Sequence, residues 1–280
     1  MRWFVTGAGG QLATAFERIL EGDVFLSREA ALDIRDADAV YAAVHSFAPD
    51  VVLHTAAYTD VDGAEAHPDV AEAINVQGTR NIVRAVSGTH TTLVYISTDY
   101  IFDGLKGSPY VESDPPGPLG VYGRTKLAGE EAVLEWAHGI CIRTSWLFSE
   151  TGRNFVKTIL AAGRERAATG EPLRVVDDQV GAPTYATHLA HAVDEALRQG
   201  VGAGIYHMAG GGYCSWCELA QEVVQLAGIE VEVLPISTAE AGRLAPRPAF
   251  SALISERPIP RLPHWADGAA EAVDRLIPLG

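Results

Sequence analysis

The chain has 280 residues, 48% of them hydrophobic, and its 36 acidic and 21 basic side chains give a formal net charge of −15. This length is enough for one large or two coupled domains, whereas so acidic a surface repels phosphate backbones, so no nucleic-acid partner is expected. No apolar run reaches the ~18 residues that a membrane span requires, and residue 3 already begins an apolar strand pattern without a signal sequence before it. We therefore expect a cytoplasmic protein without membrane contact.

In the first half of the chain, short β-rich runs alternate with helical patterns. The expected strands are Trp3–Thr6, Val24–Leu26, Val51–His54, Thr92–Ile96 and Ile140–Thr144. The helices expected between them are Ala13–Leu20, Ala37–Phe47, Pro68–Val86 and Lys126–Trp136. Alternation at this spacing is typical of βαβ units, and continuous apolar strands are typical of a sheet covered on both faces. The sequence predicts an α/β fold with a doubly wound parallel sheet of the Rossmann type.

After about residue 146 the alternation becomes irregular. The segments expected there are a helix over Asn154–Arg166, a strand over Leu173–Val176, a helix over Thr187–Gln199, the run Gly204–Met208 and a helix over Trp216–Leu226. Residues 240–268 are rich in proline and arginine. We predict that residues 1–146, with later returns near 173–208, form a dinucleotide-binding domain. Residues 147–280 would form mainly a smaller C-terminal substrate-binding domain over the carboxyl edge of the sheet.

Cys214 and Cys217 form a C-x-x-C pair at the start of a helical stretch. This spacing is compatible with a redox or metal site, but three cysteines provide no second pair to complete a zinc site. We expect these cysteines to pack in the protein interior and predict no metal site.

The first predicted strand runs into a glycine-rich turn. Gly7, Gly10 and Ala13 occupy the small positions of a G-x-x-G-x-x-A motif, followed by a helix. Such a turn lets the backbone approach a pyrophosphate, and the helix N-terminus that follows offers free N–H groups to it. The motif predicts a dinucleotide site that includes Gln11 and Leu12, because it lies between the first strand and a helix.

The end of the second strand bears on the choice of cofactor. A carboxylate there binds the ribose 2′-hydroxyl of NAD, whereas an arginine accommodates the 2′-phosphate of NADP. Ser27 and Arg28 occupy this place, so we predict NADPH, with NADH as an open alternative and an ordinary surface arginine as the competing interpretation.

Two further segments are expected to lie near the cofactor. Asp33 and Ile34 lie on the loop after the second strand, where they would lie beside the adenine. Ala56, Ala57 and Tyr58 follow the third strand, whose end would pass close to the cofactor.

Tyr122 and Lys126 have the Y-x-x-x-K spacing that places both side chains on one face of a helix. A free tyrosine has a pKa of roughly 10, and a neighbouring ammonium favours the phenolate. We therefore expect Lys126 to lower the pKa of Tyr122 toward the range of efficient proton transfer.

The fourth strand ends in Ser97, Thr98, Asp99 and Tyr100. A hydroxyl at this strand end, facing Tyr122, would hydrogen-bond a substrate oxygen, since ligands bind at the carboxyl edge of such sheets. The alternative is that Thr98 only caps nearby backbone.

With these motifs the chain resembles the extended short-chain dehydrogenase/reductases, and more narrowly the dTDP-4-dehydrorhamnose reductase family. The resemblance covers nearly the whole chain, and the segments that carry it are Gly7–Leu12, Thr55–Glu65, Ser97–Gly104, Tyr122–Glu130, Arg143–Leu147 and Asp178–Thr184. It implies the triad Thr98, Tyr122 and Lys126, in which Tyr122 and Lys126 also contact the cofactor. It also implies cofactor contacts by Gly10, Gln11, Leu12, Asp33, Ile34, Ala56, Ala57 and Tyr58. Residues implied at the substrate are Thr98, Asp99, Tyr100, Trp146 and Arg247, with Arg247, Pro248 and Ser251 matching an R-P-x-x-S segment.

The resemblance implies NADPH-dependent reduction of the C4 keto group of a dTDP-linked 4-keto-6-deoxysugar, such as dTDP-4-dehydro-L-rhamnose, by a monomer or homodimer. Many relatives carry an acidic residue in place of Ser27, which leaves cofactor choice open. Some form a magnesium-linked dimer through a glutamate where this chain has Ala15. Two alternatives remain: a nucleotide-sugar epimerase or dehydratase, and a non-catalytic regulatory subunit resembling the β subunit of methionine adenosyltransferase.

Overall fold

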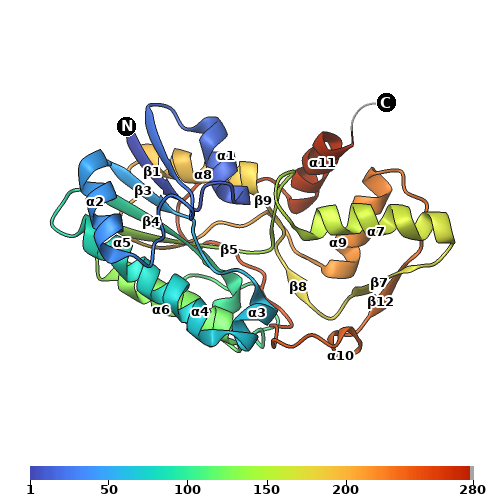
Figure 1. The fold of residues 1–280 in the computed structure, drawn as a ribbon. Coiled ribbons are helices and arrows are strands. Elements are labelled where there is room, and N and C mark those ends of the chain that lie inside the picture. The colour runs from blue at the N-terminus through green and yellow to red at the C-terminus, as the bar shows by residue number, and fades with distance from the viewer. Residues whose placement is uncertain (278–280) are drawn as a thin grey trace.

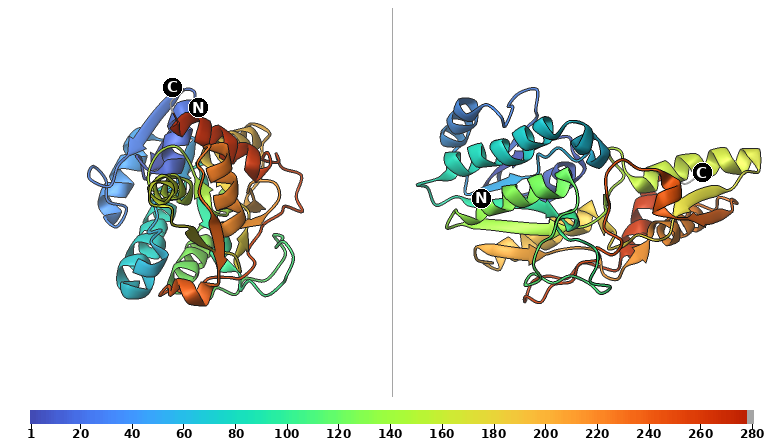
Figure 2. Two further views of the ribbon diagram at one scale, coloured as in Figure 1. Left: turned by 90° about the vertical axis from the view of Figure 1, so that its right-hand side faces the viewer. Right: turned by 90° about the horizontal axis from the view of Figure 1, so that it is seen from below.

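The computed structural model describes residues 1–277. Figure 1 shows two lobes side by side: one holds the main sheet with its helices, and the other holds α7, α9 and α11 with short strands. Viewed from below, the chain crosses between these lobes several times (Figure 2). No helix of the described residues is long and apolar enough to span a bilayer.

The main sheet has six strands, all parallel, in the order β10-β5-β4-β3-β1-β2. Their bounds are β1 Arg2–Thr6, β2 Asp23–Ser27, β3 Val51–His54, β4 Thr92–Thr98, β5 Gly139–Thr144 and β10 Gly204–His207. The strand order reverses between β1 and β3, which opens a crevice at their carboxyl ends. The predicted doubly wound sheet is confirmed.

Helices cover both faces of this sheet. On one face lie α1 (Gln11–Ile19) and α8 (Ala186–Arg198), and on the other lie α2 (Ala37–Phe47), α5 (Thr79–Val86) and α6 (Val121–Leu134). The alternation of side chains along a strand explains both cores. Val5 of β1 packs in the first core, whereas Phe4 packs in the second.

Three helical regions differ from the prediction. The single helix expected over Pro68–Val86 is α4 (Pro68–Glu72), a π-helical turn over Ala73–Gly78 and then α5. The unpredicted α3 (Val61–Ala66) begins where the Asp60 carboxylate accepts a hydrogen bond from the Gly63 N–H, a side-chain cap. Helix α6 begins five residues before the predicted Lys126, so Tyr122 lies in its first turn.

The second lobe packs α7 (Phe155–Thr169), α9 (Trp216–Leu226) and α11 (Trp265–Leu276) around its own core. Cys214 and Cys217 are buried, unbonded thiols in this core, as expected. Three two-stranded sheets complete the lobe. They are β6 (Leu147–Phe148) with β9 (Thr184–Tyr185), β7 (Leu173–Val176) with β12 (Val233–Ile236), and β8 (Val180–Gly181) with β11 (Cys214–Ser215).

The chain returns to the main sheet later than residue 173. Strand β7 pairs with β12 outside that sheet, whereas α8 packs on α1 and β10 extends the sheet beside β5. After β12 comes the short helix α10 (Thr238–Ala241), and most of the chain from there to α11 is irregular. Within it, Ser251 donates its N–H to the Val180 carbonyl of β8 at 2.8 Å, and its hydroxyl donates to Asp99 just after β4.

Candidate active site

A cavity of about 810 Å³ lies between the carboxyl ends of the sheet strands and the second lobe. It is lined from one end by the glycine-rich turn and the loop after β2, and from the other by the ends of β4 and β5 with the start of α6. The sequence-predicted residues that line it are Gly7, Gly10, Gln11, Leu12, Asp33, Ile34, Ala56, Ala57, Tyr58, Thr98, Asp99, Tyr100, Tyr122, Lys126 and Trp146. Arg28 and Arg247 are outside this lining.

The glycine-rich turn approaches the end of β3 too closely for side chains. Gly7 has φ +73°, and a Cβ there would lie 2.8 Å from the Ala56 backbone nitrogen. A Cβ on Gly10 would lie 3.0 Å from the Gly7 carbonyl oxygen. Helix α1 starts immediately afterwards at Gln11, so its unpaired N–H groups face the cavity. This bare backbone fits a pyrophosphate.

The loop after β2 presents charges other than the predicted one. Arg28 is exposed and begins a turn, in which the Arg28 carbonyl accepts from the Ala31 and Leu32 N–H groups. Glu29 and Arg35 line the cavity instead. Arg35 pairs with Asp33 at 2.6 Å, and this hydrogen bonding lowers the pKa of the Asp33 carboxyl.

Lys126 is almost fully buried beneath the cavity, 2% exposed. Its Nζ donates to the Ile96 carbonyl at 2.6 Å and lies 4.0 Å from the centre of the Tyr95 ring. Burial lowers the pKa of Lys126 to about 7, although the Glu130 carboxylate raises it. The ammonium is therefore held by a carbonyl and an aromatic face.

The expected lowering of the Tyr122 pKa is wrong for this structure. Burial raises the pKa of Tyr122 to about 12, and its contact with the Thr98 hydroxyl, which lowers the pKa, offsets only part of this. Desolvation disfavours the phenolate, while the Lys126 ammonium is occupied by the Ile96 carbonyl. The Tyr122 phenol is consequently protonated across the neutral range, which suits a proton donor.

Thr98 and Asp99 form a short polar chain at the end of β4. The Thr98 hydroxyl donates to Asp99 Oδ1 at 3.1 Å and accepts the Tyr100 N–H at 3.2 Å, so it also caps local backbone. Ser251 donates to Asp99 Oδ2 at 2.5 Å. Burial raises the pKa of Asp99 to about 6, and its hydroxyl donors oppose that shift. The second lobe thus fixes the Thr98 hydroxyl through Ser251 and Asp99.

Arg247 lies behind the cavity wall. Its guanidinium binds the Asp62 carboxylate at 3.0 and 3.1 Å, and it lies against the Tyr100 side chain. Tyr100 in turn meets the Tyr122 ring edge to face, with centroids 5.6 Å apart. The predicted substrate residue Arg247 is therefore in contact with a cavity residue without lining the cavity itself.

Two stacked indoles form the wall on the side of the second lobe. Trp146 follows β5, and Trp216 is the first residue of α9. Their ring centroids are 3.5 Å apart with an interplanar angle of 4°. Trp146 was predicted at the site, whereas Trp216 was not.

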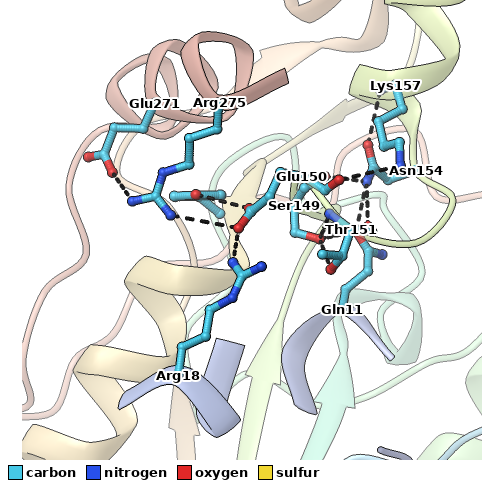
Figure 3. A network of polar contacts seen from close by, with 10 residues as sticks. Gln11, Arg18, Ser149, Glu150, Thr151, Asn154, Lys157, Glu271 and Arg275 are labelled. Atoms are coloured by element: carbon cyan, nitrogen blue, oxygen red, sulfur yellow. Dashed lines mark hydrogen bonds and ion pairs between the residues drawn. The ribbon is translucent and has the colours of Figure 1, made fainter. Parts of the chain in front are cut away.

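Polar side chains join the two lobes beside the glycine-rich turn (Figure 3). The Gln11 side-chain oxygen accepts from Ser149 Oγ at 3.0 Å and from Asn154 Nδ2 at 2.9 Å. The Glu150 carboxylate contacts Arg18 of α1 and Arg275 of α11. Helix α1, which begins directly after the glycine-rich turn, is thereby tied to the second lobe.

Comparison with known proteins agrees with this geometry. The family model described as "RmlD substrate binding domain" matches residues 1–277. The chain belongs to this family. A dTDP-4-dehydrorhamnose reductase of Sinorhizobium fredii is 37% identical over 99% of this chain and 98% of the relative. A probable dTDP-4,6-dihydroxy-2-methyloxan-3-one 4-ketoreductase of Streptomyces antibioticus is 39% identical over 99% of this chain and 96% of that one.

A solved member of the family has nearly the same fold. The crystal structure of dTDP-4-dehydrorhamnose reductase from Bacillus anthracis str. Ames in complex with NADP superposes with a TM-score of 0.93. It is 36% identical, and the match covers 98% of this chain and 99% of that chain.

For this RmlD-family chain, sequence reasoning missed mainly residues outside the motifs. Glu29, Arg35, Arg153 and Trp216 line the cavity without having been predicted to do so. The C-x-x-C pair around Trp216 drew attention to the cysteines, and these pack in the core. The one available signal was a tryptophan at the start of a helix, just after Gly210–Gly212.

Proposed function

We propose that this protein uses NADPH to reduce the C4 keto group of dTDP-4-dehydro-L-rhamnose, or of a closely related dTDP-4-keto-6-deoxysugar, to the alcohol. One observation carries the proposal: Thr98, Tyr122 and Lys126 line the same cavity as the Gly7–Gly10 turn. The proton-transfer groups and the glycine-rich dinucleotide-binding turn thus line one cavity. The names of the relatives supply the substrate class, which a cavity alone does not define.

The residues present fit a bound dinucleotide phosphate. The Gly7 and Gly10 backbone leaves room that a Cβ would fill, at the N-terminus of α1. Strand β2 ends in the neutral Ser27, so no carboxylate at that position repels a 2′-phosphate. The choice of NADPH rests on Ser27 and on the relative solved with NADP, since Arg28 is exposed and outside the cavity lining.

In the proposed reaction, bound NADPH would supply hydride to the carbonyl carbon. Tyr122, a neutral phenol at pH 7, donates its proton to the carbonyl oxygen as negative charge develops there, and regains a proton from solvent afterwards. Thr98 donates its one hydroxyl proton to Asp99 here, and in the proposed complex it turns that proton to the carbonyl oxygen and so aligns it. Lys126 lines the same cavity, and its ammonium, held on the Ile96 carbonyl, would favour negative charge that develops there.

The test uses the purified full-length chain with NADPH and a panel of dTDP-4-keto-6-deoxysugars, followed at 340 nm. We expect one NADPH oxidised per sugar reduced, and a higher kcat/KM with NADPH than with NADH. Turnover of sugar without net NADPH oxidation would instead identify an epimerase. Absence of oxidation with every sugar, together with stable binding to a larger synthetase, would replace the proposal with a regulatory subunit.

A further inference from the structure

The Asp178–Thr184 segment has no part in the proton or cofactor chemistry described above, yet it packs directly around Trp146. Gly181 lies flat against the Trp146 indole, and a Cβ on Gly181 would run into that ring. The Thr184 N–H donates to the Trp146 carbonyl at 3.2 Å. The segment therefore contacts both the side chain and the backbone of a cavity residue.

Trp146 has an unusual backbone conformation. Its φ is +46°, in the left-handed region that bulky L-residues rarely adopt. Such conformations are strained and persist only where the surroundings enforce them, which is most common at functional sites. In this conformation the indole lies on Gly181 and forms part of the cavity wall.

The other face of Trp146 is covered by Trp216. The two indole planes are nearly parallel, with an interplanar angle of 4° and ring centroids 3.5 Å apart. Two contacts hold Trp216 in place. Its Nε1 donates to Gln179 Oε1 at 3.2 Å, and the Phe155 ring packs against it with ring centroids 4.5 Å apart. Gln179 belongs to the same segment as Gly181, so one stretch of chain fixes both tryptophans.

The wall lies close to the reacting groups. Trp146 follows Thr144 by two residues, and Thr144 is the parallel partner of Thr98 across β4 and β5. A planar ketone has two faces, and hydride addition to one or the other gives epimeric alcohols at that carbon. Which face meets the hydride depends on how the sugar ring lies in the cavity, and a rigid flat wall permits fewer orientations than a mobile one.

We infer that Gln179, Gly181 and Trp216 are positioning residues: they hold the Trp146 indole as a fixed wall that selects one face of the keto sugar. This inference rests on the proposed reduction of a dTDP-4-keto sugar. It extends the site beyond the substrate contact expected of Trp146 alone, and assigns the Asp178–Thr184 segment a role in stereochemical outcome.

The test compares Trp216→Ala and Trp216→Phe with the unchanged protein, using the dTDP-4-keto sugar that is turned over best. The readouts are KM for the sugar, Kd for NADPH and the ratio of C4 epimers in the product by NMR. For Trp216→Ala we expect about a tenfold higher KM, the minor C4 epimer at 5% or more of the product, and an NADPH Kd within twofold of the original. Trp216→Phe keeps an aromatic face and should restore most of the selectivity.

A matched control is Trp136→Phe. Trp136 lies outside the cavity lining and donates its indole N–H to the Thr91 carbonyl at 3.0 Å, so this variant loses a tryptophan without touching the wall. Its KM and epimer ratio should equal those of the original protein. A folded Trp216→Ala protein that makes a single epimer with unchanged KM would overturn the inference.

A milder variant keeps the inference testable if Trp216→Ala fails to fold. Gln179→Met removes the hydrogen bond to Trp216 and keeps the side-chain length, and we expect a smaller change of the same kind in KM and epimer ratio. Unchanged values in a folded Gln179→Met protein would count against the role of Gln179. If the original protein reduces none of the sugars, the proposed function fails; if it reduces them and the variants change nothing, only this inference fails.

Discussion

In the sheet lobe the reacting side chains stand on regular elements, whereas in the second lobe the residues of the cavity wall are brought together by two-residue strands and loops paired across the chain. Tyr122 and Lys126 lie on one face of α6, and Thr98 ends β4. Trp146, Trp216 and Ser251, in contrast, are brought together by β6–β9, β8–β11 and a backbone bond to Val180. The difference suggests that the two lobes have different roles. The sheet lobe carries the reacting side chains and most of the rigidity, and the second lobe determines the shape of the cavity.

The strongest test of this division is Tyr122→Phe. Because the phenol proton is lost while the ring remains, we expect kcat to fall ~10²–10⁴-fold with NADPH affinity within about twofold of the original. Steady-state assays and fluorescence titration with NADPH measure the two quantities. Near-normal turnover in this variant would remove the proposed proton donor and, with it, the chemical role given to the sheet lobe.

The rigidity of the sheet lobe is tested at its buried ion pair. Arg143 of β5 binds Glu130 of α6 at 2.8 Å, with the two side chains only 3% and 1% exposed. Arg143→Met leaves the Glu130 carboxylate buried without its partner, so we expect a loss of about 3–5 kcal/mol in unfolding free energy. Urea denaturation measures this loss. The double variant Arg143→Met/Glu130→Gln should recover much of it, and no recovery would show that packing rather than charge is responsible.

The pH dependence tests the buried ammonium. Lys126 has its pKa lowered to about 7, so its charge is lost as pH rises through that value, whereas Tyr122 stays protonated until about 12. We expect kcat/KM for NADPH, which reports the free enzyme, to fall about tenfold per pH unit above the Lys126 pKa. Lys126→Arg stays charged, so its profile should lack this limb. A flat profile from pH 6 to 9 in the unchanged protein would contradict the assignment.

The smallest effect is expected where the lobes meet at Glu150. Its carboxylate contacts Arg18 and Arg275 from two lobes, but both arginine side chains are 46% exposed. Ion pairs open to solvent contribute little, so Glu150→Gln should cost about 1 kcal/mol or less, with the difference shrinking at high salt. Arg198→Gln, which breaks a pair within α8, serves as the control for a lost surface charge. A loss of unfolding free energy as large as that of Arg143→Met would contradict the proposed difference between the two regions.

The same contrast explains what the sequence could predict. Strand Val51–His54 and helix Ala37–Phe47 were predicted with their observed bounds, because apolar runs and helical spacing are local signals. The start of α6 was predicted too late, since Tyr122-Gly-Arg-Thr has no apolar periodicity to mark a helix. Strand β12 and helix α11, which flank the stretch rich in proline and arginine, were not predicted.

At the site, motif residues were predicted and residues placed by distant pairing were not. Gly7, Tyr122 and Lys126 line one cavity as their spacing indicated. Trp216 reaches the same cavity only because β8 pairs with β11, and no local pattern encodes that pairing. The Tyr122 pKa was predicted in the wrong direction because burial, which a sequence does not display, outweighs the nearby ammonium.

The edge strand β10 has a consequence for the order in which this molecule is made. Residues 204–207 add the sixth strand to a sheet whose other five strands end at residue 144, and α8 (186–198) covers one of its faces. A growing polypeptide therefore cannot complete its nucleotide-binding half until about two hundred residues have left the ribosome, by which time much of the other half has also emerged. Until then β5 presents an unpaired strand edge, so truncated products that stop before residue 204 should be prone to aggregate.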